Sequence, residues 1–438
     1  MSQHTMYNII DRKKNGEKLE KSEIKWVIDG LMDNSIEDYQ ITALLMAIFL
    51  KGMDPEETAD LTDAMLYSGR TLKFDGENVI DKHSTGGIGD KASFILAPIA
   101  AACGVKVPMI AGRGLGFTGG TVDKIEAIKG FKTSLNLDGF EKLLREKGMV
   151  LIGQTDEIAP ADKKIYALRD VTATIDSIPL ITASIMSKKL AEGANGIVMD
   201  IKVGSGAFMR NRVQAKKLAK SIIATAKRFD KKAVALLTNM NQPLGTSVGH
   251  SLEIRESCEV LKGNGAKDIT ELSIHLAAHM IHIGGAAPSF TKALSMAKKT
   301  IKDGSAFKKF EELIKNQGGD VSQINDYTKL PLAKVQLKVL SPKTQYIKNF
   351  INDEIGFLCT ELGGGRKVKS DIIDHGVGFV FHKKIGDKVQ EGEAILTIYH
   401  NKDQIDKADE VAKKILSKVI KFSKTKVSKP EIIYEIVR

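Results

Sequence analysis

The residues best suited to chemistry lie in a glycine-rich segment that reads KHSTGGIGDKAS over residues 82–93. Its three glycines let the backbone approach a ligand closely, and its amides form an anion site together with the N-terminus of the helix expected next. Lys82 adds a positive charge, and Ser84 and Ser93 add hydroxyl donors. The spacing matches neither the GxxxxGK[ST] phosphate loop nor the GxGxxG dinucleotide motif. We therefore expect an anion site of another type, with an ordinary tight turn as the alternative.

A second glycine-rich segment, GRGLGFTGGTVDKIE over residues 112–126, also follows an expected strand and opens a helix. Loops at the carboxyl ends of neighbouring parallel strands meet at one edge of the sheet, so the two segments are expected to converge on one phosphate. Thr121 is the expected hydroxyl donor of this loop. Arg113 has two interpretations that the sequence leaves open, a direct contact with the anion or an ion pair with Asp123.

A third group of candidate residues lies on two expected helices between residues 158 and 194. Arg169 stands near the end of the first helix, and Ser184 and Lys188 are four residues apart on the second, which places them on one helical face. An exposed cation usually forms a surface ion pair. Because residues 178–181 are mostly apolar, we instead expect Arg169 and Lys188 to face a cleft.

The first 68 residues have the apolar spacing of helices. After Ser22, apolar residues recur at Ile24, Val27, Ile28 and Leu31. The run Asp54-Pro55-Glu56-Glu57 combines a capping Asp, a first-turn Pro and a Glu at the third position, and so predicts a helix start.

From about residue 78 strands and helices alternate, which indicates an α/β domain with a mixed, mostly parallel sheet. Strands are expected at 79–80, 105–110, 149–152, 196–203 and 233–237, with helices at 92–103 and 140–147. The last hundred residues are β-rich and similar to the small barrel-sandwich of biotinyl and lipoyl carriers, without the lysine-bearing turn of a carrier. Three domains follow: a helical lobe (1–68 and 158–194), an α/β phosphate-binding domain (74–157 and 195–330) and a C-terminal β-rich α+β domain (331–438).

Composition limits the class of protein. The chain of 438 residues has neither an apolar run of the roughly 18 residues needed to span a membrane nor the apolar core of a signal peptide, so we expect a cytoplasmic protein. Cys103, Cys258 and Cys359 are far apart, as reduced thiols commonly are. The formal net charge of +11 favours anionic ligands. Dispersed lysines and an aromatic content of only 6% argue against nucleic acid and membranes as partners.

Five motifs in order carry a resemblance to a known family: KHSTGGIGDK, AGRGLGFTGGTVDKIE, IGQTDEIAPADKKIYALRD, TATIDSIPLITASIMSKKLAEGA and KVGSGAFM. With this order and spacing the chain resembles the thymidine and pyrimidine-nucleoside phosphorylases over nearly its whole length. The resemblance implies a cytoplasmic homodimeric pentosyltransferase of pyrimidine salvage, with the dimer contact on the helical lobe. It would split thymidine, deoxyuridine and, in the broad-specificity branch, uridine with inorganic phosphate. The sequence around residues 240–244 and 262–265 favours that branch.

The resemblance also implies roles for individual residues. Phosphate contacts fall on Lys82, Ser84, Ser93 and Thr121. The base is held by Arg169, Ser184 and Lys188, with His83 beside it. The expected catalytic residues are His83, which donates a hydrogen bond or proton to the departing base, and the cations Arg169 and Lys188, which stabilise its developing charge.

Three positions depart from the family pattern. Ala111 stands where relatives commonly have Ser, and Phe117 where they often have His. Relatives of the broader type bind a monovalent cation, and the matching positions are Gly89, Lys91, Leu244, Ser247 and Glu256. Because Lys91 carries an ammonium group, we expect it to pair with Glu256 and replace potassium, so that no cofactor is required.

Two other functions remain as alternatives. A phosphoribosyltransferase of related fold, such as the anthranilate type, would need magnesium and acidic residues that hold a diphosphate. A nucleic-acid-binding protein on a decayed enzyme scaffold would not need its cations intact. His275, His279 and His282 have a spacing that can hold a metal, although packing inside a helical core is the simpler interpretation.

Overall fold

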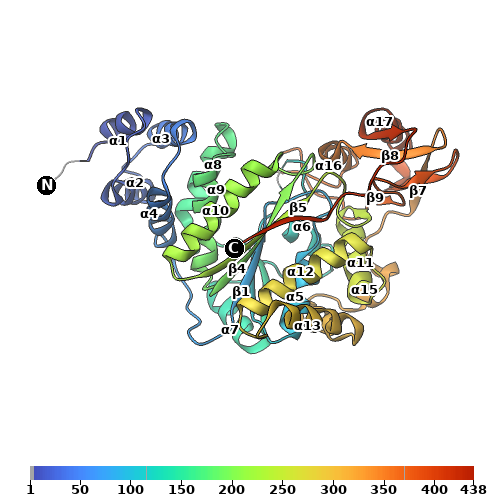
Figure 1. The fold of residues 1–438 in the computed structure, drawn as a ribbon, viewed down its shortest axis with the longest axis horizontal. Coiled ribbons are helices and arrows are strands. Elements are labelled where there is room, and N and C mark those ends of the chain that lie inside the picture. Colours follow the sequence, from blue (N-terminus) through green and yellow to red (C-terminus); the bar gives the residue numbers. More distant parts are fainter. Residues whose placement is uncertain (1–3, 115, 369) are drawn as a thin grey trace.

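A computed structural model describes residues 4–114, 116–368 and 370–438. A helical unit lies at one end of the molecule, an α/β domain in the middle and a β-rich unit at the other end (Figure 1). The fold class expected from the sequence is therefore confirmed. Among the described residues, no helix is long and apolar enough to cross a membrane.

The helical unit is built from four N-terminal helices and the later pair α8 and α9, whose apolar faces share one core. The expected start at Asp54 is confirmed, because its carboxylate accepts the amides of Glu56 and Glu57 and the Glu57 side chain accepts the amide of Asp54. The helices are α1 (Met6–Lys14), α2 (Lys21–Asp33), α3 (Asp38–Lys51), α4 (Pro55–Leu66), α8 (Pro160–Val171) and α9 (Ile178–Ala191).

The central sheet has the order β1-β4-β5-β13, in which the first three strands are parallel. Alternate side chains of β4 enter two different cores: Val198 packs with α5 and α12 on one face, and Ile197 packs with α9 and α10 on the other. A second parallel pair, β2 and β3, joins this sheet through a bridge between Val79 and Lys106. The strands are β1 (Ile80–Ser84), β2 (Val107–Ala111), β3 (Met149–Gly153), β4 (Gly196–Val203) and β5 (Lys232–Asn239).

Several helices surround these strands. They are α5 (Ser93–Ala102), α6 (Thr121–Ile125), α7 (Leu137–Lys147), α10 (Arg212–Arg228), α11 (His250–Leu261), α12 (Lys267–Ile283), α13 (Phe290–Lys302), α14 (Ser305–Asn316) and α15 (Ser322–Asn325).

The C-terminal unit contains two small antiparallel sheets with the orders β10-β8-β12 and β6-β9-β11-β7. Its elements are β7 (Val335–Leu340), β8 (Gln345–Phe350), α16 (Asn352–Glu361), β9 (Gly378–Phe381), β10 (Lys388–Val389), β11 (Ala394–His400), α17 (Ile405–Lys414) and β12 (Ile420–Ser423).

The α/β domain and the C-terminal unit exchange strands. The short strand β6 (Ser247–Val248) leaves the α/β domain and pairs with β9, whereas the last strand, β13 (Ile433–Val437), returns to pair antiparallel with β5. The sequence predicts that all of residues 331–438 belong to the C-terminal domain. The structure differs at β13, which belongs to the central sheet. This strand covers an edge of the central sheet that would otherwise be open.

Candidate functional site

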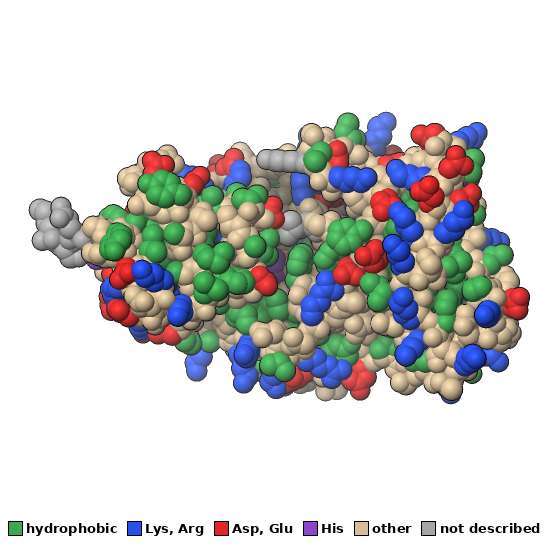
Figure 2. Space-filling view, turned by 90° about the horizontal axis from the view of Figure 1, so that it is seen from above, with side chains coloured by type: hydrophobic (Ala, Val, Ile, Leu, Met, Phe, Trp, Pro, Cys, Tyr) green, Lys and Arg blue, Asp and Glu red, His purple; other side chains and the backbone are tan. Residues whose placement is uncertain are grey.

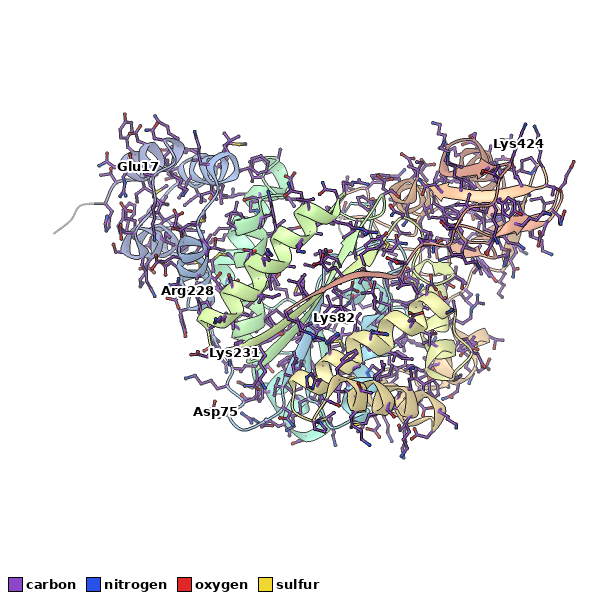
Figure 3. All side chains as sticks on the ribbon, viewed as in Figure 1. Glu17, Asp75, Lys82, Arg228, Lys231 and Lys424 are labelled. Carbon is purple, nitrogen blue, oxygen red and sulfur yellow. The ribbon has the colours of Figure 1, made fainter. Side chains whose placement is uncertain are left out.

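The first glycine-rich segment begins on a strand rather than in a loop. Lys82, His83 and Ser84 form the end of β1, with His83 opposite Met199 and Ser84 opposite Asp200 on β4. Lys82 lies near the middle of the molecule, on the central sheet (Figure 3). Ser93 is the first residue of α5. The strand therefore holds Lys82, His83 and Ser84 on a rigid element, and residues 85–92, which include the three glycines, form the loop.

Asp90, which the sequence interpretation did not single out, organises this loop. Its carboxylate accepts a hydrogen bond from the Ser84 hydroxyl and lies 3.8 Å from the ammonium group of Lys202. Burial alone would raise the pKa of Asp90, but Lys202 and Lys82 outweigh it and hold this pKa below its ordinary value. The carboxylate therefore stays charged and fixes the hydroxyl of Ser84.

A second carboxylate beneath the loop is Asp200 on β4. It accepts hydrogen bonds from Lys202 Nζ at 2.6 Å and from the Thr238 hydroxyl at 2.6 Å. Lys82 Nζ is 3.9 Å from the same carboxylate. Lys82 is thus held by a long ion pair and keeps donor capacity for an anion. Asp200 was also missed, because nothing in the sequence marks which strand lies beside β1.

The two glycine-rich loops converge, as their positions after parallel strands predict. Lys124 on α6 donates to the backbone oxygen of Asp90 at 2.8 Å and pairs with Glu253 at 2.7 Å. Thr121 begins α6 and is partly exposed. Leu115, in the middle of the second loop, lies outside the described residues.

Arg113 forms the ion pair that the sequence left as one of two options. Its guanidinium contacts Asp123 at 2.8 Å and Glu126 at 2.7 and 2.9 Å. The hydrogen bond to Glu126 raises the pKa of Arg113 further. This arginine therefore fastens the loop to α6.

On the helical side, Ser184 and Lys188 lie on one face of α9, as their spacing predicts, with Lys188 Nζ 2.9 Å from the Ser184 hydroxyl. Lys188 also pairs with Asp162 of α8, whose carboxylate is almost fully buried. Asp162 is another residue that the sequence interpretation missed. Its only signal is its place at the start of α8, seven residues before Arg169.

Arg169 is buried, with 1% of its surface exposed. Its guanidinium donates to the backbone oxygens of Thr174 and Leu180, both at 3.2 Å, and to that of Ile175. Burial lowers the pKa of Arg169, and the nearby charge of Asp162 acts in the opposite direction. The arginine thus holds the connection between α8 and α9 in place, and its charge has no carboxylate in direct contact among the described residues.

The two sides meet at His83. Lys189, next to Lys188 on α9, bonds to Asp81 of β1 at 2.5 Å and to the backbone oxygen of Ile110 at 3.1 Å, which fixes α9 against the sheet. Burial, followed by Lys189, Lys188 and Lys82, holds the pKa of His83 well below its ordinary value. His83 is therefore neutral at physiological pH and lies within the electrostatic range of cations from both sides. Figure 2 shows the surface hollowed between the helical unit and the rest of the molecule.

The positions matched to a cation site also come together. Lys91, Leu244, Ser247 and Glu256 form one buried group, and Gly89 lies against its backbone oxygens. The expected pair between Lys91 and Glu256 is present at 2.8 Å.

The other two departures have different surroundings. Ala111 ends β2 and is partly exposed. The ring of Phe117 lies 5.6 Å from that of Phe208 and 5.7 Å from that of Phe357, so it links the second loop to the C-terminal unit.

The three helical histidines make ordinary packing contacts. His275 and His279 lie against the ring of Phe290, and His282 is 3.4 Å from the backbone oxygen of Ala287. No group of three or more potential metal ligands occurs within residues 4–114, 116–368 and 370–438.

Family models match three parts of the chain. The α/β domain of the glycosyl transferase family matches residues 76–307, its helical bundle domain matches residues 7–69, and the C-terminal domain of pyrimidine nucleoside phosphorylase matches residues 346–419.

Individual proteins are similar over the whole chain. The pyrimidine-nucleoside phosphorylase of Geobacillus stearothermophilus is 44% identical over 433 residues, which cover 98% of this chain and 99% of the relative. That of Bacillus subtilis is 43% identical over 434 residues, which cover 99% of each. Among solved structures, an anthranilate phosphoribosyltransferase from Thermus thermophilus has a TM-score of 0.59 at 18% identity and covers 70% of this chain and 99% of its own. That likeness concerns the fold alone.

Proposed function

Because the chain belongs to the family of pyrimidine-nucleoside phosphorylases, we propose that it catalyses the reversible phosphorolysis of pyrimidine nucleosides. A phosphate oxygen bonds to C1′ of the sugar while the bond from C1′ to the base breaks, and the electron pair leaves with the base. The proton that hydrogen phosphate loses ends on the base, so the products are free base and a pentose 1-phosphate. The observation that best supports this reaction is that α9, which carries Lys188 and Lys189, is fixed against β1, which carries Lys82 and His83.

Phosphate is proposed to bind between the two glycine-rich loops. Lys82 supplies charge, and the hydroxyls of Ser84, Ser93 and Thr121 supply donors. Ser84 donates its single hydroxyl hydrogen to Asp90, so phosphate must take this hydrogen from Asp90 when it binds.

The base is proposed to contact Arg169, Ser184 and Lys188. A pyrimidine that leaves with the electron pair is an anion, and the two cations stabilise a charge that develops only in the transition state. The nearly complete burial of Arg169 supports this role, because electrostatic interactions are stronger where water is excluded.

His83 is proposed to donate a hydrogen bond to the base in its neutral form. The lowered pKa supports a neutral donor over an imidazolium. A neutral imidazole has one N–H donor and can polarise a carbonyl without adding a charge to the site.

The protein is further proposed to be a cytoplasmic homodimer that associates through its helical lobe. Tyr7, Tyr39 and Leu50 on α1 and α3 are each more than 70% exposed, and apolar side chains gather on this lobe (Figure 2). Exposed apolar groups of this kind are typical of a contact surface. Sedimentation equilibrium at micromolar concentration should give twice the mass of the chain.

A phosphoribosyltransferase is the competing assignment, since an enzyme of that class shares the fold. Such a reaction would need carboxylates free to hold the magnesium that binds a diphosphate. At the first loop, Asp90 and Asp200 are instead held by Lys202 and by hydroxyl groups. Phosphorolysis that is unaffected by a magnesium chelator would support the phosphorylase.

The test is release of free base from thymidine, deoxyuridine and uridine in parallel, with and without inorganic phosphate. We expect phosphate-dependent release from all three nucleosides. Release from the deoxynucleosides alone would narrow the substrate range, and no release from any of them would contradict the proposal.

A further inference from the structure

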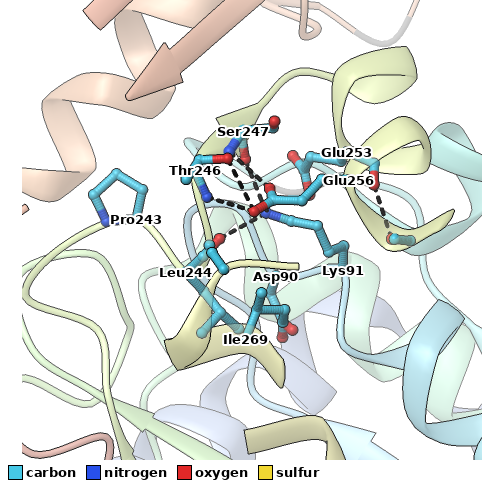
Figure 4. A network of polar contacts seen from close by, with 12 residues as sticks. Asp90, Lys91, Pro243, Leu244, Thr246, Ser247, Glu253, Glu256 and Ile269 are labelled. Atoms are coloured by element: carbon cyan, nitrogen blue, oxygen red, sulfur yellow. Dashed lines mark hydrogen bonds and ion pairs between the residues drawn. The ribbon is translucent and has the colours of Figure 1, made fainter. Parts of the chain in front are cut away.

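Lys91 is a buried cation with all its donors used. Its side chain is fully buried, and its ammonium group lies 2.6 Å from the backbone oxygen of Leu244, 3.0 Å from that of Ser247 and 2.8 Å from Glu256 Oε2 (Figure 4). A lysine ammonium has three N–H donors. Each of them therefore has one oxygen acceptor.

The three oxygens form a rigid cage. The carboxylate of Glu256 also accepts the amides of Thr246 at 2.7 Å and Ser247 at 2.8 Å, which fixes both of its oxygens. Burial alone would raise the pKa of Glu256, but the charge and hydrogen bond of Lys91 and the amides of Thr246 and Ser247 together hold this pKa below its ordinary value. The chain at Gly89, with a φ of +69°, passes so close that an added Cβ would lie 2.8 Å from the Leu244 oxygen. Nothing but glycine fits there without a shift.

Backbone oxygens with one carboxylate are a suitable donor set for a monovalent cation, since carbonyl oxygens can replace the hydration shell of potassium. Here the ammonium group of Lys91 takes the central position. A potassium ion would be of similar size and equal charge, so the two cannot share the cage. A potassium ion therefore does not fit in this cage of the chain.

We propose that Lys91 is a tethered cation that replaces a bound monovalent ion and makes the protein independent of potassium. A covalently attached cation does not dissociate, so its occupancy of the cage does not depend on the salt concentration. The proposal concerns the state of this cage and does not depend on which nucleoside the enzyme uses.

The cage joins parts of the molecule that are distant in sequence. Lys91 belongs to the first glycine-rich segment, two residues before Ser93, whereas Leu244–Ser247 is the turn that enters β6 and the C-terminal sheet. A second lysine holds the same turn from its other side: Lys384 donates to the backbone oxygens of Gly245, at 2.6 Å, and Pro243. Carbonyl groups along one turn are thus divided between two ammonium groups.

This arrangement makes Lys91 a positioning residue for the phosphate loop. It fixes the distance between that loop and the turn, and it touches no group that reacts. Its loss should weaken phosphate binding and lower stability, and a free cation of the right size should restore both.

The experiment compares wild type with Lys91→Thr in potassium chloride and in tetramethylammonium chloride at equal ionic strength. The readouts are the Tm and the KM for phosphate. Wild type should give the same values in both salts. Lys91→Thr should have a lower Tm and a higher phosphate KM in tetramethylammonium, and potassium at about a hundredfold its Kd should raise the Tm by roughly 3 °C.

Lys13→Thr is the matched control. Lys13 is also buried and paired with a glutamate, Glu57 at 2.6 Å, but it lies in the helical unit, and its other oxygen contact is a single backbone oxygen at 3.4 Å. Its loss should lower the Tm equally in both salts. The Tm readout needs no substrate, so a failure of the proposed reaction and a failure of this inference are distinguishable.

Three results would overturn the inference. The first is a potassium-selective increase in the Tm or activity of wild type. The others are a Lys91→Thr variant whose Tm is the same in both salts, or one that folds in neither salt. A variant that folds only with potassium would support it. In crystals soaked with rubidium, we expect anomalous signal among Leu244, Ser247 and Glu256 in the variant, and signal there in wild type would contradict the proposal.

Discussion

The two sides of the proposed site are built on different principles. On the sheet side, Lys82 and Lys202 face Asp90 and Asp200, so two ammonium groups are balanced by two carboxylates on or beside rigid strands. On the helical side, Asp162 is the one carboxylate among the described residues in direct contact with Lys188, and Arg169 is held by neutral backbone oxygens instead.

This difference suits two kinds of anion. Phosphate is already charged when it binds, so a balanced network with fixed hydroxyl and amide donors can hold it without excessive affinity. The base becomes charged only as it leaves, so an excess of positive charge on that side acts on the transition state more than on the substrate. Substitutions on the two sides should therefore alter different kinetic constants.

The largest effect is expected for Arg169→Ala. It removes a buried charge on the base side, and we expect kcat/KM for thymidine to fall roughly 10²- to 10³-fold. Steady-state kinetics at saturating phosphate measure this. Arg70→Ala is the control, because Arg70 is half-exposed and pairs only with surface carboxylates, Asp138 and Glu157, so kcat/KM should change by less than about twofold. If kcat/KM falls by less than tenfold in Arg169→Ala, the distinction between the two sides is contradicted.

Lys82→Met should have an intermediate effect. It removes the charged donor of the sheet side, and we expect the phosphate KM to rise roughly 10- to 100-fold, the value of one charge-assisted hydrogen bond. The nucleoside KM should change little. Lys188→Met should have the opposite effect, with a larger rise in the nucleoside KM than in the phosphate KM. If each variant changes the phosphate KM and the nucleoside KM equally, the two sides of the cleft do not bind different ligands.

The smallest effect concerns pH. Because burial and three lysines lower the pKa of His83 from its ordinary value of 6.5, the imidazole is neutral in the folded protein from pH 6.5 to 8. The ratio of kcat/KM between wild type and His83→Asn should therefore stay within about twofold over this range, since titration of phosphate itself cancels in the ratio. If His83 acted as an imidazolium acid, the ratio would fall as the pH rises.

Local features of the sequence predicted much of this molecule. The capping run at Asp54, the spacing of Ser184 and Lys188, and the placement of two glycine-rich loops after strands depend only on neighbours in the chain. The pair of Lys91 with Glu256 was expected from the resemblance, and the structure contains it.

What the sequence did not predict depends on residues far apart in the chain. Asp162 meets Lys188 across 26 positions, and Lys202 meets Asp90 across 112. The exchange of β6 and β13 likewise requires the folded backbone. The carbonyl partners of Arg169 are only 5 to 11 residues away, but they depend on the path of the chain between α8 and α9. Hydrophobic periodicity places strands but does not say which strand lies beside which.

The central claim is that one cleft holds phosphate on its sheet side and a pyrimidine on its helical side. A crystal structure of the protein with phosphate and thymine bound tests it most directly. We predict phosphate within hydrogen-bond distance of Lys82, Ser84, Ser93 and Thr121, and the base within hydrogen-bond distance of Arg169, Ser184 and Lys188. A base bound elsewhere, with Arg169 and Lys188 directed away from it, would contradict the account.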